Sequence, residues 1–183
     1  MKRVNIMIGR FQPFTKGHYK CIEEARRVKD VPTVICMIDT KEDKIDKKHP
    51  FPSSMLLPIY KELFKKDRNI EDIVLVGSAD IVKIAEQLKN YEIVSWTCGT
   101  DRIDTYEKLT AKYHDQAGLP DDFSMIEIKR TGEDISATKV RQALLDDDKG
   151  EFLRMTPMIS LSSKLKVDIY NTLREQILKV YAE

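Results

Sequence analysis

Short apolar runs that suit buried strands alternate along this chain with segments whose apolar residues recur at helical spacing. The strand-like runs fall at residues 4–8, 33–39, 73–77, 92–99 and 124–130, and helical patterns fill the intervals. Continuous apolar runs joined through helices are typical of parallel sheets that are covered on both faces. The sequence therefore predicts an α/β fold, an open parallel sheet of about five strands with helices on both faces.

Helical patterns occupy residues 18–29, 53–66, 79–90, 101–114 and 136–148, and the longest covers residues 161–182. Pro58 lies inside the second pattern and should bend or delay that helix, because proline lacks a backbone N–H. The C-terminal helix has an apolar stripe that fits packing on the sheet or, alternatively, a subunit interface in a homo-oligomer. The stripe consists of Leu165, Ile169, Leu173, Ile177 and Val180.

The length of 183 residues suits a single domain, with a core region at residues 1–150 and a C-terminal helical extension at residues 151–183. The formal net charge of +1 gives no sign of a nucleic-acid or membrane surface. Three cysteines, far apart and in apolar runs, indicate reduced core thiols, and no metal-binding set is expected. With neither a signal-peptide pattern nor an apolar run near the ~20 residues of a membrane helix, we expect a cytoplasmic protein.

The stretch GRFQPFTKGH, residues 9–18, follows the first strand and leads into a helix. Its glycines are eight residues apart, so neither the phosphate loop G-x-x-x-x-G-K nor the dinucleotide pattern G-x-G-x-x-G fits. The stretch nevertheless lies at the carboxyl end of a strand, where open α/β sheets bind ligands. Gly9 would let the backbone pass close to such a ligand.

An anion site is expected in the first turn of the helix that follows. With Thr15 as N-cap, the amides of Gly17 and His18 would point out of that turn toward a phosphate. Gly17 would leave room for the phosphate, and His18 would donate a hydrogen bond to it, with Arg10 and Lys16 adding mobile positive charge. A purely structural turn, in which His18 packs against the sheet, also fits this stretch.

The segment DISATKVRQAL, residues 134–144, offers a second phosphate site far away in the sequence. Ser136 is a natural N-cap, but Lys139 and Arg141 follow it where a capping box would have an acidic residue. Cations at the start of a helix oppose its dipole, so a bound polyphosphate would explain them. A charged surface helix fits the same pattern.

A third segment, CGTDR at residues 98–102, ends the fourth strand. Gly99 would allow a flat ring to approach the backbone closely. Asp101 would accept a hydrogen bond from a sugar hydroxyl or, alternatively, cap the next helix.

Residues 41–52 are densely charged and contain two prolines. They fit either a mobile loop beside the site or a solvated surface loop.

These segments together carry a family resemblance. GRFQPFTKGH resembles the (H/T)xGH signature of the nucleotidyltransferase superfamily, and ISATKVR resembles its second signature, ISxTxxR. The Gly-Arg-Phe-Gln-Pro start and the CGTDR turn are similar in particular to the nicotinamide mononucleotide (NMN) adenylyltransferases, and the likeness extends over about residues 4–145. The resemblance implies a Rossmann-like fold, in agreement with the pattern of strands and helices.

The resemblance also implies roles for the matching positions. Thr15, His18 and Arg141 would be catalytic and act on the phosphates of ATP. The remaining positions would bind the nucleotide, and they are Gly9, Arg10, Phe11, Lys16, Gly17, Gly99, Asp101, Ser136, Thr138, Lys139 and Val140.

The implied reaction transfers AMP from ATP to NMN and gives NAD and pyrophosphate. Mg²⁺ would be bound mainly through the ATP phosphates. Positioning and charge stabilisation would provide the catalysis, because the acceptor phosphate is already ionised at neutral pH and needs no general base. The expected partners are therefore ATP and NMN or a similar phosphorylated small molecule.

Two departures from the closest pattern leave the acceptor open. Thr15 replaces a histidine, and Met55 and Leu56 stand where an arginine is expected. The alternatives are an adenylyl- or cytidylyltransferase that acts on a phosphopantetheine- or glycerol-phosphate-like acceptor, and a non-catalytic nucleotide-binding sensor. The presence of both His18 and Arg141 argues against the sensor.

Overall fold

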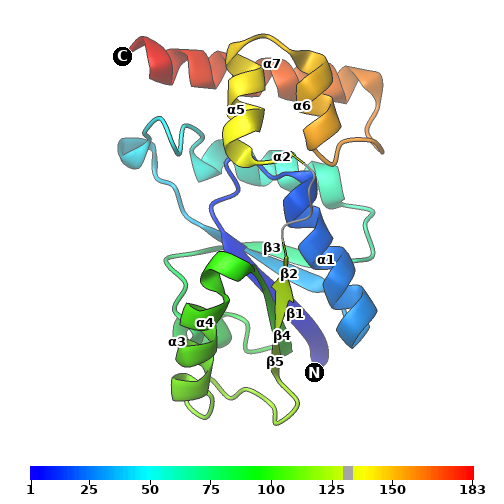
Figure 1. Ribbon diagram of the computed structural model, residues 1–183, viewed down its shortest axis with the longest axis vertical. Coiled ribbons are helices and arrows are strands. Elements are labelled where there is room, and N and C mark those ends of the chain that lie inside the picture. The colour runs from blue at the N-terminus through cyan, green and yellow to red at the C-terminus, as the bar shows by residue number, and fades with distance from the viewer. Residues whose placement is uncertain (130–133) are drawn as a thin grey trace. The chain divides into compact units, whose positions relative to one another are not determined.

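The computed structural model describes residues 1–129 and 134–183 (Figure 1). The chain forms two compact units whose segments alternate along the sequence. The first unit contains Met1–Gly9, Lys20–Ile38 and Asp67–Glu133, and the second contains Arg10–Tyr19, Asp39–Lys66 and Asp134–Glu183. The expectation of one domain with a boundary at residue 150 stays a prediction.

The first unit is built on a parallel sheet, which confirms the predicted fold class. Its strands are β1 (Lys2–Gly9), β2 (Thr33–Ile38), β3 (Ile70–Val76), β4 (Tyr91–Gly99) and β5 (Ser124–Ile128). They lie in the order β3-β2-β1-β4-β5, and each neighbouring pair is parallel. The order reverses between β1 and β4, so a ligand crevice is expected at the carboxyl ends that carry Gly9 and Gly99.

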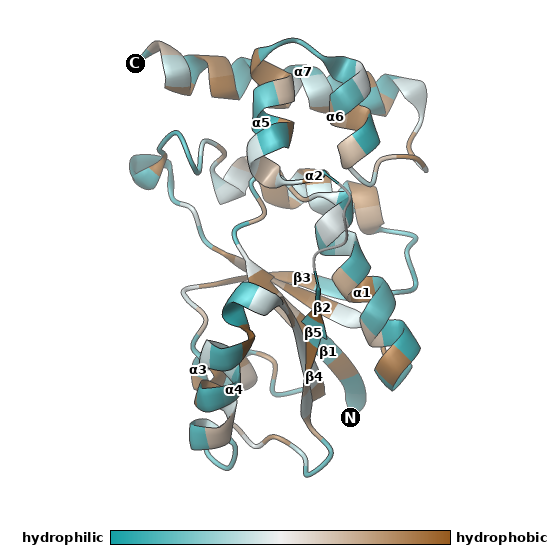
Figure 2. Cartoon of the chain, in the orientation of Figure 1, coloured by the Kyte–Doolittle hydropathy of each residue, from teal (hydrophilic) through white to brown (hydrophobic). Residues whose placement is uncertain are grey.

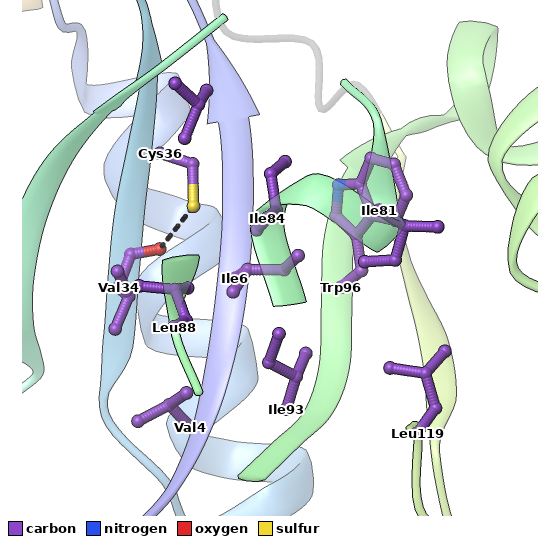
Figure 3. Close-up of a cluster of buried hydrophobic side chains, with 11 residues drawn as sticks. Val4, Ile6, Val34, Cys36, Ile81, Ile84, Leu88, Ile93, Trp96 and Leu119 are labelled. Carbon is purple, nitrogen blue, oxygen red and sulfur yellow. Dashed lines mark hydrogen bonds between the residues drawn. The ribbon is translucent and has the colours of Figure 1, made fainter. Parts of the chain in front are cut away.

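Helices cover both faces of this sheet. Figure 1 shows α1 (Lys16–Lys29) on one side, and α3 (Ile81–Gln87) and α4 (Thr100–Tyr113) on the other. The strands are largely hydrophobic, whereas the helices mix polar and apolar residues (Figure 2). In the core cluster of Figure 3, Trp96 is fully buried and stacks on Tyr106, with 4.2 Å between ring centroids.

The cysteines agree with the prediction of reduced core thiols. All three are free and buried. Burial raises the pKa of the Cys36 thiol to about 12, so this side chain stays protonated at neutral pH.

A buried polar network also ties three of the strands. Asn5 Nδ2 donates to Thr33 Oγ1 at 3.1 Å, and the hydroxyls of Ser95 and Thr97 donate to Asn5 Oδ1 at 2.8 and 2.7 Å. Because a buried polar group without a partner is costly, the network favours one register of β2, β1 and β4. The sequence pattern alone places Asn5 within an apolar run and does not indicate this role.

The second unit contains α2 (Ser53–Phe64), α5 (Ala137–Leu145), α6 (Lys149–Met155), α7 (Ser163–Ala182) and the short 3-10 helix η1 (Glu42–Lys44). Helix α2 begins at Ser53 as predicted and continues through Pro58, which therefore does not delay it. Helix α6 was not expected. The side chain of Asp148 caps it by accepting a hydrogen bond from the N–H of Glu151 at 3.2 Å. No helix within the described residues combines the length and apolar character needed to cross a membrane.

The C-terminal helix α7 packs against α5, with Ile169, Leu173 and Ile177 buried. This arrangement differs from the expected packing on the sheet, because the apolar stripe of α7 packs against α5 within the second unit.

Helix α7 also contacts the charged segment at residues 41–52. Gln176 Nε2 donates to the carbonyl of Pro50 at 3.0 Å, and the Lys47 ammonium lies 5.2 Å from the ring centroid of Tyr181.

Candidate active site

Thr15 caps α1, as the sequence predicts. Its Oγ1 accepts from the backbone N–H of His18 at 3.3 Å, and its carbonyl accepts from the N–H of Tyr19 at 3.1 Å. The amide of His18 therefore donates to the capping side chain, whereas the sequence pattern predicted that it would be free to bind an anion. A Cβ on Gly17 would lie 3.4 Å from Thr15 Oγ1, an ordinary contact, so the protein alone does not require glycine there.

The imidazole of His18 turns back onto the same cap. Its Nδ1 accepts a hydrogen bond from the backbone N–H of Thr15 at 2.9 Å. A ring nitrogen that accepts from an amide carries no proton, so the neutral ring has its proton on Nε2. Within residues 1–129 and 134–183, nothing hydrogen-bonds to Nε2, which leaves this N–H available to a ligand oxygen.

Two phenylalanines enclose this ring. The Phe11 ring meets the imidazole edge-on at 5.0 Å between centroids, and the Phe14 ring lies at 5.2 Å. Burial among these groups lowers the pKa of His18 to about 4. His18 is therefore a neutral hydrogen-bond donor at physiological pH, not a cation.

The loop before the cap is fixed by a buried tyrosine on α2. The Tyr60 hydroxyl donates to the carbonyl of Phe11 at 2.7 Å and accepts from the N–H of Phe14 at 2.9 Å. Phe11 has φ of 52°, in the left-handed region that a bulky residue rarely adopts. The sequence pattern does not indicate this role of Tyr60, because any large apolar residue on α2 would satisfy the helical pattern.

Polar side chains hold the same loop at two further points. The Gln12 amide donates to the carbonyl of Phe51 at 2.8 Å and accepts from its N–H at 2.9 Å. The guanidinium of Arg10 donates to Thr40 Oγ1 at 3.2 Å and to the carbonyl of Asp39 at 3.4 Å. Arg10 was expected to supply mobile positive charge, but these bonds restrain it.

The second signature segment reaches this loop through Arg141. Its Nη1 donates to the carbonyl of Gln12 at 2.7 Å, and its Nη2 donates to Thr138 Oγ1 at 3.3 Å. The pKa of Arg141 is lowered because burial outweighs the electrostatic interactions with Tyr181 and Asp46, and a guanidinium remains cationic under such a shift. His18 and Arg141 are therefore both hydrogen-bonded to the backbone of the same stretch, residues 12–15, within the second unit.

The neighbours of Arg141 on α5 have different environments. Ser136 caps the helix by accepting from the N–H of Lys139 at 3.1 Å, as predicted. Lys139 is exposed and forms an ion pair with Asp134. Val140 is fully buried in the core, so its side chain is not presented at the surface.

Gly99 and Asp101 belong to the first unit, as does Gly9. Gly99 occupies the N-cap position of α4, and no side chain caps this helix by a hydrogen bond. Asp101 lies exposed in the first turn, so the alternative in which it is the N-cap is wrong. A Cβ on Gly99 would come within 2.9 Å of Asp101 Oδ1, so glycine permits the observed position of this carboxylate.

Comparison with known sequences places these features among nucleotidyl-transfer proteins. The model of the family described as cytidylyltransferase-like matches residues 6–143. A phosphopantetheine adenylyltransferase of Lactobacillus gasseri is 33% identical over 90 residues, which are 49% of this chain and 50% of the relative, so the chain spans half of that protein's length. A probable nicotinate-nucleotide adenylyltransferase of Sulfurimonas denitrificans is 23% identical over 159 residues, covering 78% of this chain and 85% of the relative.

Solved structures show the same fold. The nicotinic acid mononucleotide adenylyltransferase of Plasmodium falciparum, complexed with NaAD, superposes with a TM-score of 0.60 at 16% identity, covering 96% of this chain and 98% of that one. A bifunctional NMN adenylyltransferase/ADP ribose pyrophosphatase of Francisella tularensis, complexed with AMP and a Mn ion, gives 0.59 at 20% identity, covering 100% of this chain and 53% of that one. At such identities the likeness establishes the Rossmann-like fold alone.

Proposed function

Because the chain belongs to the cytidylyltransferase-like family of nucleotidyltransferases, we propose that it is an adenylyltransferase that transfers AMP from ATP to NMN, giving NAD and pyrophosphate. The relatives and solved structures described above include adenylyltransferases for pyridine mononucleotides and for phosphopantetheine. They support adenylyl transfer to a phosphorylated acceptor, and the GRFQP and CGTDR segments favour NMN among such acceptors.

One observation carries the proposal. The amide of Thr15 fixes the tautomer of His18, so that a neutral Nε2–H is available, while Arg141 brings a fixed cation to the same loop. Transfer of a nucleotidyl group needs donors and positive charge around phosphate oxygens, and it needs no covalent enzyme intermediate. The second unit provides both kinds of group.

In the proposed reaction, a phosphate oxygen of the acceptor attacks the α-phosphorus of ATP in line, and pyrophosphate leaves. His18 donates its Nε2 proton in a hydrogen bond to the charge that develops on the α-phosphate. Arg141 and Lys139 neutralise the departing pyrophosphate. Mg²⁺ enters as part of the substrate MgATP and shields negative charge on its phosphates.

A second acceptor class has specific support. Of the two sequence relatives described above, the phosphopantetheine adenylyltransferase has the higher identity, 33% against 23%, although its match covers only 49% of this chain. Leu56, at the position where the NMN enzymes are expected to have an arginine, is fully buried and offers no charge to an acceptor. A phosphopantetheine-like acceptor is therefore the second candidate.

A turnover screen separates these candidates. ATP and CTP are each incubated with Mg²⁺ and with NMN, nicotinate mononucleotide, phosphopantetheine or glycerol phosphate, and pyrophosphate release and product mass are measured. We expect ATP with NMN to give NAD at the highest kcat/KM. Turnover confined to phosphopantetheine or to CTP would replace the NMN assignment, and tight ATP binding without pyrophosphate release would favour the sensor.

A further inference from the structure

We propose that Tyr60 is a positioning residue for His18: its hydroxyl holds the two aromatic residues that enclose the imidazole and thereby sets the position of this ring and the rate of adenylyl transfer. The part of the inference that concerns rate rests on the proposed function. Tyr60 is only 2% exposed, so it acts through the loop and not by touching a substrate.

The geometry of the Tyr60 hydroxyl is the first step. A phenol has one proton to donate and can accept in return, and both capacities are used here. The hydroxyl donates to the carbonyl of Phe11 at 2.7 Å and accepts from the N–H of Phe14 at 2.9 Å. One side chain therefore closes the Phe11-to-Phe14 segment on itself, and it does so in a buried place where water does not compete for these groups.

Tyr60 holds Phe11 and Phe14, and the rings of these same two residues enclose His18. The Phe11 and Phe14 rings lie 5.0 and 5.2 Å from the imidazole centroid. The residue after Phe14 is Thr15, whose N–H donates to His18 Nδ1 at 2.9 Å. The Tyr60 hydroxyl therefore helps to position both the phenylalanine rings around the imidazole and the Thr15 N–H that selects its tautomer.

The third step is the backbone conformation of Phe11. Its φ of 52° is unfavourable for a residue with a large side chain and persists only where the surroundings hold it. The bond from Tyr60 to the Phe11 carbonyl is one such restraint, and the bond from Arg141 to the next carbonyl, that of Gln12, is another. Loss of the first restraint should let Phe11 relax away from the imidazole.

Removing the hydroxyl tests this chain of contacts. In Tyr60→Phe, the carbonyl of Phe11 and the N–H of Phe14 lose their partner, and the loop should shift to admit water. Water around His18 reduces the burial that lowers its pKa, so this pKa should rise by at least about one unit toward 6.5. A misplaced donor should also lower kcat by about 10-fold, with a smaller change in the KM for ATP.

Tyr170→Phe is a matched control within the same unit. Tyr170 is also buried, and its hydroxyl donates to Asp147 Oδ1 at 2.7 Å. Its ring packs on Phe152 of α6 and lies below the Lys149 ammonium, so the described hydrogen-bond and ring partners of Tyr170 all lie outside the loop that carries His18. The control therefore removes a hydrogen bond of a buried tyrosine, with its contribution to the free energy of unfolding, and leaves the surroundings of the imidazole unchanged.

The imidazole pKa is measured by NMR titration of the full chain without substrate, with the His18 signal identified among the three histidines by its absence in His18→Gln. We expect Tyr60→Phe to raise this pKa and lower kcat, and Tyr170→Phe to change neither. Unchanged pKa and kcat in Tyr60→Phe, with a drop in unfolding temperature like that of the control, would refute the positioning role.

The experiment also separates the positioning role of Tyr60 from the proposed function and from a loss of folding. If wild-type protein releases no pyrophosphate with any acceptor, the proposed function fails, but the titration still decides whether Tyr60 controls His18. If Tyr60→Phe unfolds under the assay conditions, all variants are measured in sucrose, which stabilises the folded state without restoring the hydroxyl.

Discussion

The Nη1 atom of Arg141 lies 2.7 Å from the carbonyl oxygen of Gln12, so the second signature segment is hydrogen-bonded to the backbone of the first. A guanidinium has five N–H groups, and this bond uses one of them. A second N–H group donates to Thr138 Oγ1, and the other donors would be available to a phosphate while Arg141 keeps the loop in place. Arg141 thus has a structural role in this loop, and in the proposed reaction it would also have an electrostatic one.

His18→Ala should lower kcat for pyrophosphate release by about 100-fold, because a hydrogen bond made mainly in the transition state is lost as rate. The KM for ATP should change much less. Steady-state kinetics with ATP and the accepted acceptor measure both. His114→Ala, at the C-cap of α4, is the control and should retain wild-type kinetics. A His18 variant with near-normal kcat and a lowered unfolding temperature would mark this residue as structural.

Arg141→Ala should raise the KM for ATP by about 10-fold and also reduce kcat, because charge-assisted hydrogen bonds to phosphate exist before and during the transition state. Arg141→Lys should recover only part of this loss, since lysine lacks the planar fork that reaches the Gln12 carbonyl and a phosphate together. Arg27→Ala, which removes an exposed arginine paired with Glu24, is the matched control. In a double variant with His18→Ala, the two losses should combine to less than their product. A fully multiplicative loss would argue that the residues serve separate sites.

The stability of the protein should depend on pH through His18. Its pKa of about 4 in the folded chain lies below the ordinary 6.5, so the unfolded chain takes up a proton first as the pH falls. Stability from the neutral ring is therefore complete above pH 6.5 and decreases toward pH 4. Urea unfolding at pH 7 and pH 4.5 should show a difference that is smaller in His18→Gln by on the order of 2 kcal/mol. Equal differences in both proteins would contradict the low pKa.

Gln12→Leu should destabilise the protein by about 1–3 kcal/mol, because it leaves both backbone groups of Phe51 without their partner in a buried place. The control is Gln87→Leu, which removes a single amide hydrogen bond to the carbonyl of Leu75 at an exposed site. Urea unfolding of both variants gives the comparison. A similar cost for both would show that the Gln12 clamp contributes no more than a surface contact.

The sequence predicted the features that depend on local chemistry. Apolar runs located all five strands, and Thr15 and Ser136 could be identified as caps because a capping side chain acts within one helical turn. Features that depend on partners distant in sequence could not be found from periodicity. Tyr60 lies 49 positions from Phe11, and the Asn5 bond to Thr97 spans 92, distances over which periodicity carries no information.

Some local readings failed for identifiable reasons. The helical pattern at residues 136–148 extends past the end of α5, and it includes Asp148, which caps α6, a helix too short for a clear periodic pattern. Arg10 looked mobile because its acceptors, Thr40 and the Asp39 carbonyl, follow β2 and are not adjacent in sequence.

The alternation of the two units along the chain sets an order of events during synthesis. A nascent chain that ends at residue 129 already contains every strand of the sheet and the whole GRFQPFTKGH stretch, but none of α5, α6 or α7. Because the chain emerges from the ribosome N-terminus first, Arg141 becomes available only after every strand of the described sheet. The loop that carries His18 can therefore form its hydrogen bonds to Tyr60 and Phe51 earlier in synthesis, and its hydrogen bond to Arg141 comes last.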